Sequence, residues 1–248
     1  MKKHILLLTA VCSAFMLKAG DLNTTYHGGG SSDSKLTIGL SVGAGIPLSD
    51  FANKTKDTIP ADSNKIHGFA NTGFHFNATA SYIFAGPLGA MVSIGGTMNS
   101  YDAVTATSVY FPHGGGVITA TSYYVGEYLV GPCVSFGDKL KLNIHALVGL
   151  VTVNRPTTTI TFAGGTDVTS GNGASGFGYN FGAGIKYNFT DKIGLLIDLG
   201  YTGTTANYTG YTDVQTSGSF SGTTTNTGSK SNMNVAIFTA TAGIAFNL

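Results

Sequence analysis

The segment KLTIGLSVGAGI, residues 35–46, alternates large apolar residues with small or polar ones at every second position. Successive side chains of a β-strand point to opposite faces of the sheet, so this segment predicts a strand with two unlike faces. Leu36 and Leu40 lie on its apolar face, and Thr37 and Ser41 lie on the other face. A soluble sheet can show the same alternation. The fold class therefore depends on how many such segments follow and on how they are connected.

Seven further segments show the same period of two. They lie near residues 74–82, 88–99, 121–136, 140–150, 178–188, 193–202 and 236–247. Pro132 falls inside the fourth strand and has no amide hydrogen for the ladder, so we expect a bulge or local irregularity there. Charged residues make up only 10% of the chain, against about 25% in soluble domains. This composition favours a protein with a large apolar surface.

The lengths of the predicted connections alternate along the chain. Three turns of a few residues, near 86, 138 and 191, separate four long connections that are rich in Thr, Ser, Gly and Asn. The long connections span about 47–72, 100–120, 152–176 and 203–232. Membrane barrels pair short periplasmic turns with long extracellular loops in this way. The sequence therefore predicts an all-β fold, an eight-stranded antiparallel up-and-down transmembrane β-barrel.

The N-terminal residues have the pattern of a secretory signal. Lys2 and Lys3 precede an apolar run from residue 5 to 17, and the small residues Ala19 and Gly20 follow it. The run is too short for a membrane-spanning helix. Lipid attachment at Cys12 is disfavoured because Val11 precedes the cysteine. We expect a cleaved signal peptide at 1–20, a flexible periplasmic segment at 21–33 and the barrel domain at 34–248.

Aromatic residues mark the ends of every second predicted strand, on the apolar face. They are Tyr82, Phe84, Phe136, Tyr187, Phe189 and Phe246. Amphipathic rings favour the interface between membrane and water. We therefore predict that these six side chains form a belt at one membrane interface. In a soluble barrel the same rings would face inward beside polar side chains, which is unfavourable.

The chain resembles the small outer-membrane β-barrel proteins, described as porin-like or as outer-membrane protein β-barrel domains, with the OmpA and OmpX type of architecture. The resemblance rests on the signal peptide, the rhythm of strands and turns, the segment GEYLVGP at 126–132 and the C-terminal segment GIAFNL at 243–248. It implies insertion into the outer membrane by the barrel-assembly machinery, which recognises an aromatic residue near the end of the last strand. Here the final residue is Leu248, and Phe246 stands two positions earlier.

Ionisable side chains on the polar faces predict a network inside the barrel. Its expected members are Lys35, His75, Glu127, Lys141, His145, Lys186 and Asp198. Charges in a low-dielectric interior need partners. One hypothesis is that these groups form a gate or a narrow ion-selective path. The favoured interpretation is a structural network, because eight strands leave room only for side chains or one small ligand.

No pattern for catalysis or for cofactor binding stands out. His75 and His145 are expected in the interior with Ser81, Ser93 or Asp198 near them, but no strong acyl-hydrolase motif surrounds them. No two histidines have metal-ligand spacing, and Cys133 is the single cysteine after residue 20. Arg155 is the only arginine of the chain, which disfavours nucleic acid as a partner. We expect no enzyme, no metal and no cofactor.

Three classes of function remain open. The leading hypothesis is an integral protein of the cell outer membrane, a scaffold whose polar surface loops contact the environment or envelope partners that the sequence does not identify. The alternative is a transport protein, either a narrow pore or a route for small apolar molecules. A soluble periplasmic ligand-binding barrel is the third, and the outward aromatic residues disfavour it.

Overall fold

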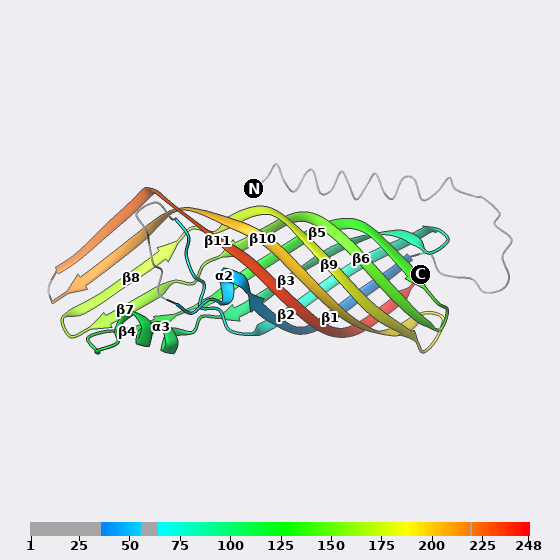
Figure 1. Cartoon of the computed structure of the whole chain (residues 1–248), viewed down its shortest axis with the longest axis horizontal. Helices are drawn as coiled ribbons and strands as arrows, with labels where there is room; N and C mark the ends of the chain where they lie inside the picture. Colours follow the sequence, from blue (N-terminus) through cyan, green and yellow to red (C-terminus); the bar gives the residue numbers. More distant parts are fainter. Residues whose placement is uncertain (1–35, 56–63, 219) are drawn as a thin grey trace. The chain divides into compact units, whose positions relative to one another are not determined.

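Eight strands form a closed ring in the computed structural model, which describes residues 36–55, 64–218 and 220–248 (Figure 1). The strands of the ring are β1 (Leu36–Leu48), β2 (Gly73–Ala85), β3 (Leu88–Ser100), β5 (Ser122–Phe136), β6 (Leu140–Asn154), β9 (Ala174–Asn188), β10 (Ile193–Ser217) and β11 (Phe220–Asn247). Each pairs antiparallel with its neighbours in this order. The predicted eight-stranded antiparallel barrel is confirmed.

The first and last strands close the ring. Strand β1 pairs with β11 over twelve positions, from Thr37 opposite Asn247 to Leu48 opposite Ala236. Closure leaves no unpaired edge along the ring, which is the condition under which a β-sheet can cross a bilayer. Strand β1 begins at the same end as the three short turns, since Leu36 also lies opposite Tyr82 at the end of β2.

Three of the predicted long connections contain structure of their own. Helix α2 (Ser49–Ala52) follows β1, and α3 (Ala103–Tyr110) and β4 (Val117–Ala120) lie between β3 and β5. Strands β7 (Thr158–Phe162) and β8 (Gly165–Gly171) form a hairpin between β6 and β9.

The prediction that residues 203–232 form a loop is wrong. Strands β10 and β11 continue as a paired hairpin from the ring to Ser217 opposite Phe220, with one irregularity between Thr209 and Tyr211. The segment is rich in Thr and Tyr, which favour strands, but small and polar residues occupy most of its positions, so the sequence shows no clear period of two. Beyond the ring β10 also pairs with β8, β8 with β7, and β7 with β4.

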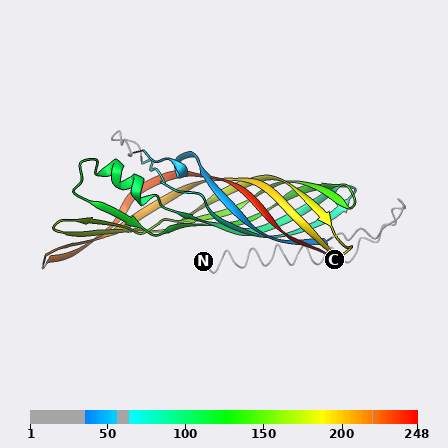
Figure 2. The ribbon, with the colours of Figure 1, turned by 90° about the horizontal axis from the view of Figure 1, so that it is seen from below.

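We call the structure formed by α3, β4, β7, β8 and the ends of β10 and β11 the outer extension. Figures 1 and 2 show these elements together, at the end of the barrel opposite to the short turns.

The outside of the ring is apolar. Large side chains on alternate positions of every strand are exposed, among them Leu40, Ile94, Ile144, Leu199 and Ile244. Exposing this much apolar surface to water is unfavourable, whereas the hydrocarbon core of a bilayer accepts it. The exterior is thus the surface that a membrane-spanning barrel requires. Among the described residues, no helix has the length and apolar character needed to cross a membrane.

The hydrogen-bonded ladder between β5 and β6 is interrupted at Pro132, and its register is the same on both sides of the gap. Val130 pairs with Val148, and pairing with β6 resumes at Cys133 opposite His145. Residues 131 and 132 are skipped on that side, although Pro132 remains opposite Ala90 on β3. The expected irregularity is present as a gap in one ladder, because proline lacks the amide donor. The predicted signal peptide at 1–20 and the segment at 21–33 lie outside the described residues.

Candidate functional site in the barrel interior

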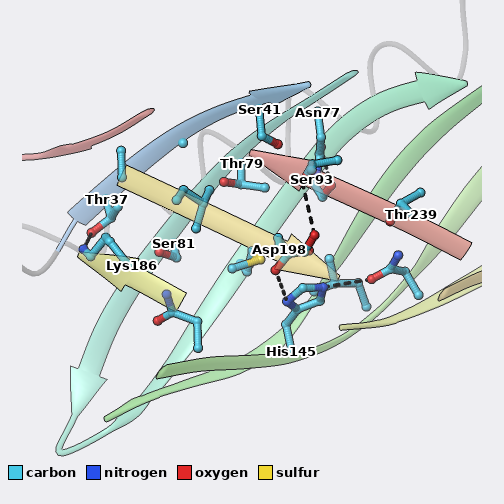
Figure 3. Close-up of a pocket in the computed structure, with 18 of the residues that line it drawn as sticks. Thr37, Ser41, Asn77, Thr79, Ser81, Ser93, His145, Lys186, Asp198 and Thr239 are labelled. Carbon is cyan, nitrogen blue, oxygen red and sulfur yellow. Dashed lines mark hydrogen bonds and ion pairs between the residues drawn. The ribbon is translucent and has the colours of Figure 1, made fainter. Parts of the chain in front are cut away.

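The candidate site is a set of polar side chains on the inward positions of the ring (Figure 3). Alternation along each strand places the polar residues inside, opposite to the lipid-facing ones. They line a cavity of only about 40 Å³ in the interior. A single water needs about 10–15 Å³ by this kind of measure, so the cavity admits a few waters and no larger solute.

Glu127 stands at one end of a chain of polar groups. The residue is 3% exposed, and its Oε2 accepts a hydrogen bond of 2.9 Å from the Thr202 hydroxyl. Thr202 accepts a bond of 2.9 Å from Asn180 Nδ2. The second carboxylate oxygen, Oε1, is buried without a hydrogen-bond partner. A buried acceptor left unpaired is unfavourable, so this end of the chain is only partly satisfied.

His145 continues the chain to Asp198. Asn180 turns its Oδ1 toward His145 Nε2 at 2.9 Å, and His145 Nδ1 lies 4.0 Å from Asp198 Oδ2. Figure 3 shows the side chains of His145 and Asp198 pointing toward each other. Hydrogen bonds therefore link residues of β5, β6, β9 and β10 from Glu127 to His145, and a contact of 4.0 Å, too long for a hydrogen bond, adds Asp198. We call these five residues, Glu127, Thr202, Asn180, His145 and Asp198, the interior chain.

Two glycines leave space for the side chains of the interior chain. Gly182 lies directly opposite His145, and a Cβ placed on it would come within 2.4 Å of the imidazole. Gly184 lies opposite Asp198, and a Cβ there would come within 2.5 Å of Asp198 Oδ2. The high glycine content of the inward faces thus has a steric reason at these two positions, since any larger residue would displace the side chains of His145 and Asp198.

Lys186 forms a second group near the short turns. It donates from Nζ to Asn247 Oδ1 at 2.7 Å and to Thr37 Oγ1 at 3.0 Å. Asn247 donates in turn to Asn188 Oδ1 and to the carbonyl of Asp191. The buried cation therefore bonds to amide and hydroxyl oxygens of the first and last strands, and it joins β9 to the seam where the ring closes.

The remaining predicted members lie apart from the interior chain. His75 is buried, and its Nδ1 lies 2.8 Å from Thr97 Oγ1. Lys141 is half-buried on β6, opposite Lys186 on β9. Lys35 lies outside the described residues. The linking residues Thr202, Asn180 and Asn247 were missed, because neutral hydroxyls and amides occur at many inward positions and only their spatial arrangement distinguishes these three.

Apolar side chains fill the interior toward the end with the long connections. Val151, Met233 and Ile237 have no exposed surface, and Leu147 is also buried among them. Phe51 of α2 packs edge-on against Tyr123 at 4.9 Å between ring centroids. The alternation rule missed this cluster, because the strands there carry apolar residues on both faces. The interior therefore has no continuous polar lining in the described part of the barrel.

The arrangement holds no serine nucleophile at either interior histidine among the described residues. The ring nitrogens of His145 face Asn180 and Asp198, and His75 bonds to Thr97. Ser93 bonds instead to Asn77 Oδ1 at 2.8 Å. A triad needs its nucleophile within hydrogen-bond reach of the base. Within the described ranges there is also no group of three or more His, Cys, Asp or Glu residues arranged to hold a metal ion.

The six predicted interface aromatics lie at the end of the ring that has the short turns. Tyr187 and Phe189 meet edge-on at 5.4 Å, and Lys139 Nζ lies 5.4 Å from the centre of the Tyr187 ring. A second set of outward rings lies toward the opposite end and includes Phe74, Tyr124, Phe177, Tyr179 and Tyr201. These were not singled out from the sequence, because only the strand ends beside the short turns were considered as a belt.

Comparison with known proteins yields only distant structural likenesses. No protein-family model matches the chain, and no curated protein matches it. The structure of Neisserial surface protein A is 14% identical, covers 87% of this chain and 98% of its own, and has a TM-score of 0.43.

Two further solved structures are similar at the same level. A major outer membrane protein of Thermus thermophilus is 13% identical, with 85% and 98% of the two chains covered and a TM-score of 0.45. The Escherichia coli outer membrane protease OmpT is 11% identical, with 90% and 99% covered and a TM-score of 0.45. The hydrogen-bonded ring, and not these likenesses, defines the fold of this chain.

Proposed function

We propose that the protein is an integral barrel of the outer membrane that serves as a scaffold for the outer extension. The observation that carries this proposal is the continuity of β10 and β11, which close the ring and then pair with β8 beyond it. Loops that act only as connections need no such structure. An ordered sheet and helix held outside the membrane suit contact with the environment or with envelope partners.

The apolar exterior supports the membrane part of the proposal. Eight strands with outward Leu, Ile and Val, and rings at both ends, match the band and girdles of an outer-membrane barrel. Export through the predicted signal peptide and insertion by the barrel-assembly machinery belong to the same proposal. Phe246, which faces outward near the end of β11, is the residue expected to be recognised during assembly.

The transport alternative is less well supported by the interior. Among the described residues, the small interior cavity of about 40 Å³ and the buried cluster around Val151 and Met233 argue against a wetted path from one end of the barrel to the other. The interior chain and the Lys186 group are better explained as structural links between strands. Polar groups that hydrogen-bond across an interior rigidify it.

The first test is fractionation of the cell envelope, followed by gel mobility of the detergent-extracted protein with and without boiling. We expect the protein in the outer-membrane fraction, with mobility that changes on heating. Release into the soluble periplasm would overturn the proposal.

The second test concerns orientation. In a Cys133→Ser background, Ser217→Cys places a thiol at the tip of the β10–β11 hairpin, and Asp138→Cys places one in a short turn. We expect a membrane-impermeant maleimide to label intact cells at the first position only. Labelling of the short turn alone would reverse the proposed orientation.

A further inference from the structure

The outer extension contains a cavity of about 240 Å³. Its wall is formed by Tyr101, by Tyr110 and Phe111 at the end of α3, by Ile118 and Ile160 on β4 and β7, and by Arg155 after β6. Pockets for drug-sized ligands measure roughly 300–1,000 Å³. A cavity slightly below that range fits a ligand of one ring, and it is several times larger than the cavity inside the barrel.

Arg155, the single arginine of the chain, is held at this cavity. Its guanidinium carbon lies 4.9 Å from the centre of the Tyr208 ring. On β8, a Cβ added to Gly171 would come within 3.3 Å of Arg155 Cδ, so a glycine there leaves the space that the arginine occupies. Cation–π packing on Tyr208 positions the side chain and does not consume its N–H donors.

Arg155 has no carboxylate partner among the described residues. Lysines of the connection between β1 and β2 make ion pairs with carboxylates, Lys54 with Asp102 at 2.7 Å and Lys65 with Asp50 at 2.9 Å. A half-buried guanidinium presents a planar fork of donors that matches a carboxylate in a two-point contact. A guanidinium without a carboxylate in a preformed pocket indicates an anionic ligand.

Contacts between aromatic rings hold the aromatic part of the wall together. Tyr101 packs against Tyr123 at 6.5 Å and against Phe69 at 5.7 Å, and Phe69 packs against Tyr110 at 5.9 Å. The Thr107 hydroxyl of α3 accepts a bond of 2.9 Å from the Ile118 amide of β4, which joins helix and strand. Ring faces carry partial negative charge, and they favour the weakly positive C–H faces of a sugar.

We propose that this pocket binds a single acidic sugar unit of the uronic-acid class. Arg155 takes the carboxylate, and the ring of Phe111 takes the C–H side of the sugar. The hydroxyls of Thr158 and Thr169, which also line the cavity, bond to the sugar hydroxyls. An aromatic acid would use the rings and Arg155 but not these hydroxyl groups. The inference rests on the proposed function, since it assigns a ligand class to the outer extension.

The test is calorimetric titration of the full-length protein in detergent with glucuronate, glucose and benzoate. We expect glucuronate to bind at least about tenfold more tightly than glucose, which lacks the carboxylate, and than benzoate, which lacks the hydroxyls. Arg155→Gln should weaken glucuronate binding by at least about tenfold. Lys139→Gln is the matched control, because it removes another cation that lies over a tyrosine ring, at the opposite end of the barrel.

Each result that differs from these expectations would refute a different part of the proposal. Equal binding of glucose, or no effect of Arg155→Gln, would remove the anionic subsite, and benzoate binding as tightly as glucuronate would remove the sugar assignment. No binding by a protein that fractionates with the outer membrane and changes mobility on heating would refute the pocket and leave the scaffold proposal standing. A soluble protein would refute the scaffold whatever the titration shows.

Discussion

The hydroxyl of Thr202 donates to Glu127 Oε2 at 2.9 Å, while Glu127 Oε1 is buried without a partner. We expect Thr202→Val to lower the free energy of unfolding by about 1–3 kcal/mol, because the carboxylate loses its donor. Thr205→Val is the control, since Thr205 bonds to Asn234 on the exposed face of the same strand. Urea titration in phospholipid vesicles measures both changes. If both substitutions lowered the free energy of unfolding equally, the bond from Thr202 to Glu127 would contribute no more to stability than the exposed bond of Thr205.

Glu127→Gln should preserve or raise the free energy of unfolding. The substitution keeps an acceptor for Thr202 and removes a buried carboxyl group whose desolvation is only partly compensated. The same urea titration measures the effect. A loss as large as that of Thr202→Val would show that the negative charge itself is needed in the interior.

The filled interior predicts that the protein does not conduct ions. We expect planar bilayers containing the purified barrel to show no current steps above those of a protein-free bilayer, because buried apolar side chains close the interior. If reproducible steps appear and become smaller with Glu127→Gln or Lys186→Met, the transport alternative is correct and the scaffold interpretation of the interior is wrong.

Lipid contact predicts where an added charge is unfavourable. Leu199 is 49% exposed on the ring part of β10, and Val104 is 79% exposed on α3. Leu199→Lys should lower the free energy of unfolding in vesicles by about 2–4 kcal/mol. Val104→Lys should change it by less than about 0.5 kcal/mol, because that side chain faces water. Similar effects at the two positions would contradict the assignment of the ring exterior to lipid.

Asp102 links α3 to the loop after β1 in a pH-dependent way. Lys54 donates to its carboxylate at 2.7 Å, and the Thr105 amide donates at 3.0 Å. The bond from Lys54 and the bond from the Thr105 amide hold the pKa of Asp102 below its ordinary value. A lowered folded-state pKa stabilises the cap above the ordinary pKa near 3.8, and this contribution is lost as the pH falls through the folded-state pKa.

Hydrogen exchange of the Thr105 amide tests this cap. Its protection factor should stay constant from pH 7 to about pH 4 and fall at lower pH, since the carboxylate is then protonated. Asp102→Asn should reduce that pH dependence, and Asp102→Ala should cost the helix about 0.5–2 kcal/mol. Ser108→Ala is the control, because Ser108 bonds only to the Val104 carbonyl on the exposed side of α3. Unchanged protection in Asp102→Ala would refute the capping role.

The sequence predicted the ring well because membrane-spanning strands have two chemically different faces. Positions such as Leu40 and Ser41 differ strongly in polarity, and the structure places Leu40 outside and Ser41 inside. The hairpin at 203–232 was missed because small and polar residues occupy most positions on both of its faces, although the structure buries Ala206, Tyr208 and Met233 on one of them. The buried cluster around Val151 was missed for the opposite reason, since both faces are apolar there.

The interior chain was predictable only in part. The ionisable members Glu127, His145 and Asp198 stand out in a chain with few ionisable residues, but their order in space depends on the register between β5, β6, β9 and β10. That register is fixed by pairings between strands such as Gly182 opposite His145. Sequence patterns specify the face of a residue and leave its height in the barrel undetermined.

The seam between β1 and β11 has a consequence for how the chain folds. Thr37 and Asn247 lie opposite each other across it, so nearly the whole described chain separates the two strands that close the ring. Contacts this distant in sequence form late and slowly. Until the last strand arrives, the hairpins keep open edges and gain little of their final stability. Folding of the ring should therefore be all-or-none, completed by its C-terminal residues.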